Sequence, residues 1–248
     1  MNNQLFKGAD QINWKGIFLY YMIAVVIALP FNSSIANPYY LEFTGGTIIA
    51  QLTFLPACLG TLIAALVAFK FDVLHQKSID FFGNHTYKNT LIALVPLIVL
   101  TIFGIDNTMG WDKHIYAFTF VMIILVYSTC EEIFWRGYLQ DALRPLSIYI
   151  RFTVLGVMWW AWHFPFNDPF GWTGFLLLCL LSAFLIGKFA EESKSYFTTG
   201  GLHCLVTSLF NMNETDNNTK MLMGGLTIAV WLGIGTFWKT PLVTKDSI

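Results

Sequence analysis

The sequence predicts an all-α integral membrane protein: a single bundle of about eight transmembrane helices with both termini in the cytoplasm. Of its 248 residues, 56% are hydrophobic and only 12% are charged, whereas soluble domains carry about 25% charged residues. Apolar segments recur along the whole chain, and most approach the ~20 residues that a helix needs to cross a bilayer. No polar linker divides them, so residues 1–248 are expected to form one transmembrane domain.

Eight apolar segments are expected to form the membrane helices. The fourth is longer than the hydrocarbon layer requires. The seventh is short and rich in polar side chains, so other helices are expected to shield it from lipid. In chain order the segments are Trp14–Phe31, Gly46–Phe69, Thr90–Ile105, Ile115–Leu143, Ser147–His163, Trp172–Ala190, Ser195–Met212 and Met221–Trp238. Connections are expected at Asn32–Thr44, Phe164–Gly171 and Asn213–Lys220.

Basic residues predict the orientation, because cytoplasmic loops carry an excess of Lys and Arg. If the N-terminus is inside and eight helices alternate, 12 of the 14 basic residues fall on the cytoplasmic side. The cytoplasmic set is Lys7, Lys15, Lys70, Lys77, Lys88, Arg136, Arg144, Arg151, Lys188, Lys194, Lys239 and Lys245. The outer set is Lys113 and Lys220. Both termini are therefore expected in the cytoplasm.

Charge and cysteine content exclude several classes of protein. The net charge is −1 and no basic cluster occurs, which gives no indication of a nucleic-acid partner. The four cysteines all lie inside apolar segments without a CxxC pair. They are interpreted as small apolar core residues rather than as a disulfide framework or a thiolate metal site.

Two adjacent carboxylates stand out near the end of the fourth segment. Glu131 and Glu132 follow a long apolar run, and ionisable residues inside a membrane are costly unless a partner or a function retains them. Glu132 and Arg136 are four residues apart on one helix face and are expected to pair. Glu131 lies about 100° around the helix and is expected to project elsewhere. The alternative is a solvated charge cluster at the membrane interface.

Two histidines are candidate partners for Glu131. His163 follows an aromatic stretch and precedes Pro165, where it could instead belong to an interfacial aromatic belt. His203 lies inside the short polar segment, with Thr207 and Asn211 following at four-residue spacing on nearly the same face. The alternative there is hydrogen bonding between closely packed helices.

The lengths of the two helices decide whether Glu131 and His163 can lie close together. With about 1.5 Å per residue, Glu131 lies roughly 18 Å and His163 roughly 24 Å from the turn that joins their helices. They can therefore lie at similar depth only if the fourth helix continues past Gly137. His203 is expected somewhat nearer the cytoplasmic side.

A carboxylate and two imidazoles in a polar intramembrane cavity fit peptide hydrolysis. The carboxylate can act as a general base on water, while the imidazoles orient that water or stabilise the oxyanion. The same three groups could instead hold a zinc ion with an open position. The HExxH spacing that would favour a metal site is absent from the sequence.

The same residues resemble the motifs of the CAAX protease and bacteriocin-processing (CPBP, or Abi) family. Glu131 to Arg136 match its EExxxR motif, and Trp159 to His163 resemble its FxxxH motif with Trp in place of Phe. His203 stands where the HxxxN motif begins, and Thr207 replaces the usual Asn. The resemblance covers roughly residues 116–212, a motif-bearing core.

The resemblance implies an intramembrane endopeptidase. It implies that Glu131 activates water together with His163, that Glu132 and Arg136 hold the site, and that His203 serves the oxyanion. Thr207 or Asn211 would supply the help usually given by the Asn. The family is described both as glutamate-type and as metal-dependent, and we favour no cofactor because a third strong ligand is missing from the sequence pattern.

The implied substrate is a peptide or lipidated protein within the membrane, and membrane lipids surround the site. A bacterial cytoplasmic membrane is the expected location. One alternative is a catalytically inactive family member that acts as a membrane scaffold for a partner protein, which Thr207 keeps open. Another is a transporter with Glu131 as a proton site, against which the lack of internal repeats counts.

Overall fold

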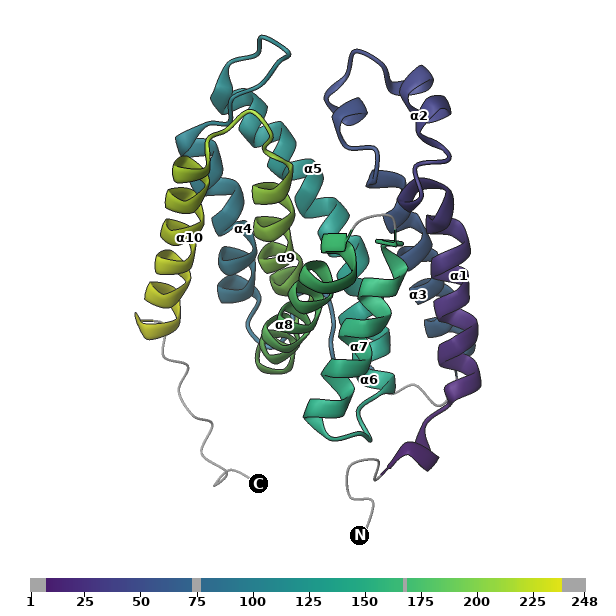
Figure 1. The fold of residues 1–248 in the computed structure, drawn as a ribbon. Helices are drawn as coiled ribbons and strands as arrows, with labels where there is room; N and C mark the ends of the chain where they lie inside the picture. The colour runs from purple at the N-terminus through teal and green to yellow at the C-terminus, as the bar shows by residue number, and fades with distance from the viewer. Residues whose placement is uncertain (1–7, 73–76, 167–168, 238–248) are drawn as a thin grey trace.

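The structure, a computed structural model, describes residues 8–72, 77–166 and 169–237 (Figure 1). Over these ranges it is a helical bundle, and the only extended pairing is an isolated bridge between Asp80 and Ser195. The predicted all-α class is therefore confirmed for the described part of the chain. Lys7, Lys239 and Lys245, which contributed to the predicted orientation, lie outside the described residues.

The α-helices follow the expected segments closely, with one addition and one shortening. They are α1 (Trp14–Asn32), α2 (Asn37–Thr44), α3 (Cys58–Phe71), α4 (Thr86–Phe103), α5 (Lys113–Phe134), α6 (Gln140–Ala142), α7 (Ile148–Trp162), α8 (Pro169–Ser193), α9 (Tyr196–Asn211) and α10 (Asn217–Phe237). Short 3₁₀ turns cover Ala9–Gln11, Ile48–Gln51 and Leu55–Ala57.

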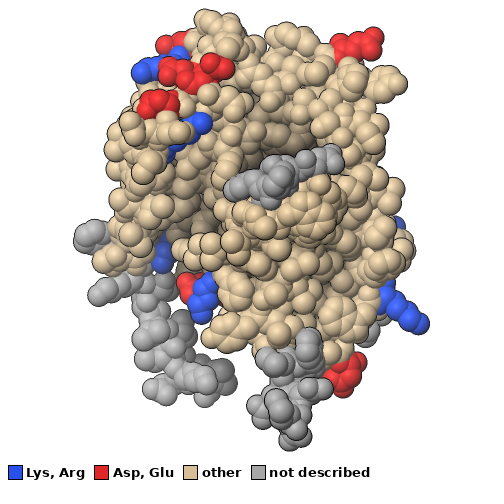
Figure 2. Space-filling model, in the orientation of Figure 1, with Lys and Arg blue, Asp and Glu red and all other residues tan. Residues whose placement is uncertain are grey.

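Several helices are suited to a bilayer. Five of the described helical stretches are long and apolar enough to cross a membrane, and two shorter ones, Leu55–Phe71 and Ile148–Trp162, are also apolar. Figure 2 shows a broad middle zone of uncharged surface, with charged side chains mainly toward its upper and lower edges. The protein is thus an integral membrane protein, while the count of eight crossings and the cytoplasmic termini stay predictions.

The second expected helix, Gly46–Phe69, is wrong in its first half. Two 3₁₀ turns, Ile48–Gln51 and Leu55–Ala57, precede α3. Gly46 adopts φ +77°, a left-handed conformation that does not occur within an α-helix. The apolar composition concealed this break, because a uniformly hydrophobic stretch carries no period from which its conformation can be inferred. The connection expected before it contains α2, which the sequence analysis did not identify.

The fourth expected helix continues past Gly137, as the depth argument required. α5 runs into a π-helical turn, Trp135–Leu139, and then into α6. In this turn the Gln140 backbone N–H donates to the Trp135 carbonyl, five residues earlier. Turns of this kind occur frequently at functional sites, and this one begins four residues after Glu131.

The polar helix α9 lies at the centre of the bundle, as predicted. It packs against α5 and α4, and Gly200 and Gly201 make that approach possible. A Cβ on Gly200 would lie 2.5 Å from the Thr129 hydroxyl on α5, and one on Gly201 would lie 2.5 Å from Ala93 Cα on α4. Two adjacent glycines thus bring α9 against both neighbours, which positions His203 beside α5.

Candidate active site

Glu132 is held by charged partners. Its side chain and that of Arg136 are both fully buried, and Arg136 Nε donates to Glu132 Oε2 over 2.8 Å. The predicted i,i+4 pair is therefore present. His203 Nδ1 lies 3.2 Å from Glu132 Oε1, a distance in the ion-pair range, although the angle does not meet hydrogen-bond geometry. Glu132 thus faces two basic side chains from two helices.

Glu131 is also fully buried but is held by neutral donors. Its Oε2 accepts hydrogen bonds from the indole N–H groups of Trp135 and Trp159, each over 3.2 Å. Its Oε1 has no hydrogen-bond partner among the residues that the structure describes. Glu131 thus projects away from the Glu132–Arg136 pair, as expected, and two tryptophans fix one of its oxygens.

Trp159 brings the predicted residues of three helices together. Besides bonding Glu131, its ring centroid lies 5.0 Å from that of His203 and 6.1 Å from that of His163. Its backbone carbonyl is 2.8 Å from His163 Nδ1. Glu131 on α5, His163 at the end of α7 and His203 on α9 therefore all lie near one indole ring.

Contacts with α1 fix the end of α7 that carries His163. The Asn32 side chain donates to the Trp162 carbonyl over 2.7 Å, and Trp162 Nε1 donates to the Ala24 carbonyl over 3.2 Å. Phe164 then turns the chain with φ +52°, a conformation uncommon for a non-glycine residue. Because α7 ends here, the imidazole of His163 stands at the helix end and reaches the cavity.

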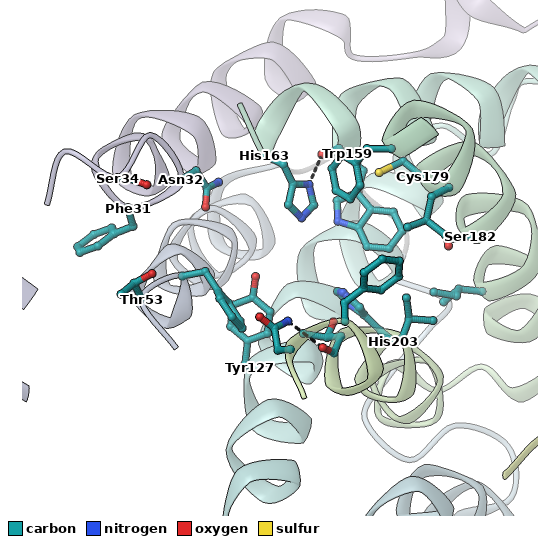
Figure 3. Close-up of a pocket in the computed structure, with 18 residues that line it drawn as sticks. Phe31, Asn32, Ser34, Thr53, Tyr127, Trp159, His163, Cys179, Ser182 and His203 are labelled. Carbon is teal, nitrogen blue, oxygen red and sulfur yellow. Dashed lines mark hydrogen bonds between the residues drawn. The ribbon is translucent and has the colours of Figure 1, made fainter. Parts of the chain in front are cut away.

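A cavity of about 400 Å³ adjoins these residues. Figure 3 shows His163, His203, Trp159 and Tyr127 among the side chains that face it. Thr207 and Asn211 also line it, so the predicted face of α9 is turned toward the cavity. The remaining wall is mainly apolar, and Glu131 is not among the lining residues. The full lining is Phe31, Asn32, Ser34, Thr53, Phe54, Tyr127, Trp159, His163, Phe175, Leu178, Cys179, Ser182, Ile186, His203, Val206, Thr207, Phe210 and Asn211.

Asn211 is tied to the position where the resemblance expects an Asn. Its Nδ2 donates to the Thr207 carbonyl over 2.8 Å. Both side chains border the cavity one and two turns beyond His203. The cavity therefore has an amide and a hydroxyl beside His203, supplied by two successive turns of α9.

The donor set for a metal ion is sparse. Over residues 8–72, 77–166 and 169–237, no group of three His, Cys, Asp or Glu side chains is arranged to hold a metal ion. Of the three candidate ligands for zinc, Glu131 has one oxygen bonded by two indoles and His203 faces Glu132. The residues present do not assemble the three-ligand set of a catalytic zinc site.

Two side chains next to the site were not predicted from the sequence. Trp135 follows Glu131 by four residues and Tyr127 precedes it by four, so helical spacing alone places all three on nearly one face. That spacing was the available signal. An aromatic residue in an apolar helix is usually core, and only the structure distinguishes an indole that bonds a carboxylate from one that packs.

The segment that carries this site is similar to known proteins. Residues 113–209 match the family model of the type II CAAX prenyl endopeptidase Rce1-like proteins. The chain is also similar to CAAX prenyl protease 2 of Methanococcus maripaludis, with 24% identity over 260 residues. The match covers 88% of this chain and 96% of that protein.

The matched segment contains every candidate residue except Asn211, which lies two residues beyond it. It spans α5, the π-helical turn, α7 and most of α9, the elements that meet at Trp159. These matches confirm the family resemblance that the motifs predicted: the motif-bearing part of this membrane protein is similar to the Rce1-like CAAX endopeptidases.

Proposed function

We propose that this protein is an intramembrane endopeptidase that hydrolyses a peptide bond with a water molecule activated by Glu131. The observation that carries the proposal is a fully buried carboxylate held by neutral donors, behind a cavity that two imidazoles line. A carboxylate in such surroundings can accept and return a proton, which is the task of a general base in hydrolysis.

The residues then take separate roles. Water attacks the carbonyl carbon and its proton passes to Glu131, while His163 orients the water. The tetrahedral intermediate carries its charge on the former carbonyl oxygen, which His203 and the α9 polar groups stabilise. When the C–N bond breaks, the amine leaves with the proton from Glu131. Glu132 and Arg136 keep His203 and the helix in position.

The proposed substrate is a membrane-anchored or hydrophobic peptide, including a lipidated protein. The cavity wall supports this, because aromatic and aliphatic side chains such as Phe175, Leu178 and Ile186 make up much of it. The name of the Methanococcus relative, a prenyl protease, points to the same class. A bacterial cytoplasmic membrane is the location that we propose, and the excess of basic residues on one side supports an orientation with both termini in the cytoplasm.

We propose further that the reaction is of the glutamate type and needs no metal. The sparse donor set described above supports this. A scaffold without activity is the alternative, because Thr207 replaces the Asn of the third motif. Asn211, hydrogen-bonded to the Thr207 carbonyl at the cavity edge, favours the active protein over the scaffold.

The test compares membrane peptides from cells that express the protein, Glu131→Gln or His163→Ala at equal levels. We expect processing by Glu131→Gln to fall by about 10²–10⁴-fold, the usual contribution of a general base. Glu192→Gln, an exposed site at the end of α8, is the matched control and should keep full activity. Processing that survives both Glu131→Gln and His163→Ala would exclude the peptidase. Purified protein that loses activity to a chelator and regains it with zinc would exclude the metal-free mechanism.

A further inference from the structure

The proposed general base does not border the space where its water would lie. Glu131 is 0% exposed and is absent from the lining of the cavity. Among the side chains that line the cavity, Trp159 donates its indole N–H to Glu131, and Tyr127 precedes Glu131 by one turn of α5. A proton that leaves cavity water for Glu131 therefore needs a group at the cavity wall that can carry it.

Trp159 cannot carry that proton. An indole N–H is a donor without an acceptor site, so it can hold a carboxylate but cannot pass a proton onward. A phenol hydroxyl is both donor and acceptor. It can give its proton to a carboxylate while it receives another from water. Of the two, only Tyr127 has the chemistry of a relay.

The position of Tyr127 suits this role. It precedes Glu131 by one turn of α5, so the two side chains share a helix face, and it lines the cavity from which Glu131 is absent. Its ring is 5% exposed and packs edge-to-face against Phe54 at 5.0 Å and near His203 at 6.4 Å. Figure 3 shows it on the α5 wall of the cavity, apart from His163.

The Glu131 carboxylate has one oxygen available for such a contact. Its Oε2 already accepts two indole hydrogen bonds. Its Oε1 is buried and has no hydrogen-bond partner in the described ranges. A buried carboxylate oxygen without a donor is costly, and the Tyr127 hydroxyl, one turn away on the same helix, is a group that can supply one.

We propose that the Tyr127 hydroxyl relays protons between cavity water and Glu131, an inference that rests on the proposed peptidase function. As water attacks the carbonyl carbon, its proton moves to the Tyr127 oxygen and the Tyr127 proton moves to Glu131 Oε1. Tyr127 is thus neutral before and after the step. On collapse of the intermediate, the proton returns along the same path to the leaving amine, and the carboxylate is regenerated.

Tyr127→Phe tests the relay, because it removes the hydroxyl and keeps the ring. In purified protein with a cleavable peptide substrate, we expect kcat to fall by about 10²-fold, the lower end of the range for a positioned proton-transfer group, with KM unchanged. The solvent isotope effect in H₂O–D₂O mixtures should fit fewer moving protons than in the wild type. Tyr116→Phe is the matched control: the same change on the same helix, at a hydroxyl that bonds Gln51 away from the cavity.

The outcomes separate the relay from the function. If Glu131→Gln abolishes cleavage while Tyr127→Phe keeps kcat and the isotope effect, the relay is wrong and the peptidase stands. If Glu131→Gln also keeps activity, the peptidase itself is wrong. If Tyr127→Phe does not fold, 3-fluorotyrosine at position 127 replaces it. A kcat that changes with the acidity of this phenol supports the relay, and an unchanged kcat overturns it.

Discussion

Glu131 and Glu132 are neighbours in the chain and equally buried, yet their surroundings differ in kind. Glu132 faces a guanidinium at 2.8 Å and an imidazole at 3.2 Å. Glu131 faces two neutral indole donors. Cationic partners form the stronger hydrogen bonds with a carboxylate and hold it in its charged form. The contrast supports the proposed division of roles, in which Glu132 maintains the structure and Glu131 exchanges a proton.

The largest effect on stability is expected from Arg136→Met, which removes the guanidinium that pairs with Glu132. The variant keeps much of the side-chain volume but leaves Glu132 buried without its main partner. Breaking a buried pair in this way costs about 3–5 kcal/mol of unfolding free energy. Denaturation in detergent by a chemical denaturant measures it. The double variant Glu132→Gln/Arg136→Met should recover most of the loss, and a single variant as stable as wild type would contradict the ion pair's role.

An intermediate effect on stability is expected from Trp135→Phe and Trp159→Phe, which act on the neutral donors of Glu131. Each removes one N–H that donates to Glu131, and hydrogen bonds to charged groups contribute about 1.5–3 kcal/mol. Trp159→Phe also installs the residue that the family motif usually has here. Unfolding free energy and cleavage rate are measured together. Trp231→Phe is the control, since it loses an indole bond to the Ile92 carbonyl instead. Equal loss of activity in all three variants would argue against a specific indole–carboxylate contact.

The smallest effect on stability is expected from His203→Gln. Its contact with Glu132 lies outside hydrogen-bond geometry, so its removal should lower the unfolding free energy by about 0.5–1.5 kcal/mol. Cleavage should suffer far more than stability, because the imidazole faces the cavity. A loss of stability as large as that of Arg136→Met would show that Glu132 depends equally on Arg136 and His203.

Local patterns in the sequence predicted the parts of the fold that depend on local spacing. Apolar segments located the helices, and the four-residue spacing of Glu132 and Arg136 predicted their ion pair, which the structure contains. The comparison of helix lengths required continuity past Gly137, which is also present. Each of these follows from the geometry of one helix or from the sum of a short connection and two helices.

Local patterns in the sequence could not predict features that depend on contacts between distant segments. The bond from Trp159 to Glu131 joins residues 28 positions apart on different helices, and no local pattern encodes it. The break before α3 was hidden because lipid-facing and core-facing sides are both apolar, which removes the amphipathic period. The π-helical turn was likewise invisible, since its residues are those of an ordinary α-helix.

The π-helical turn makes Trp135–Leu139 a joint between two orientations of one long helix. The hydrogen bond of a π turn spans five residues instead of the four of an α turn. The extra residue rotates the part of the helix that follows relative to the part before it. Glu131 can therefore face Trp159 while Gln140, beyond the turn, donates to the Gly187 carbonyl of α8 over 3.0 Å. Before the turn, the helix contributes side chains to the cavity wall. After the turn, it is anchored to α8, so the orientation of each part is determined by different contacts.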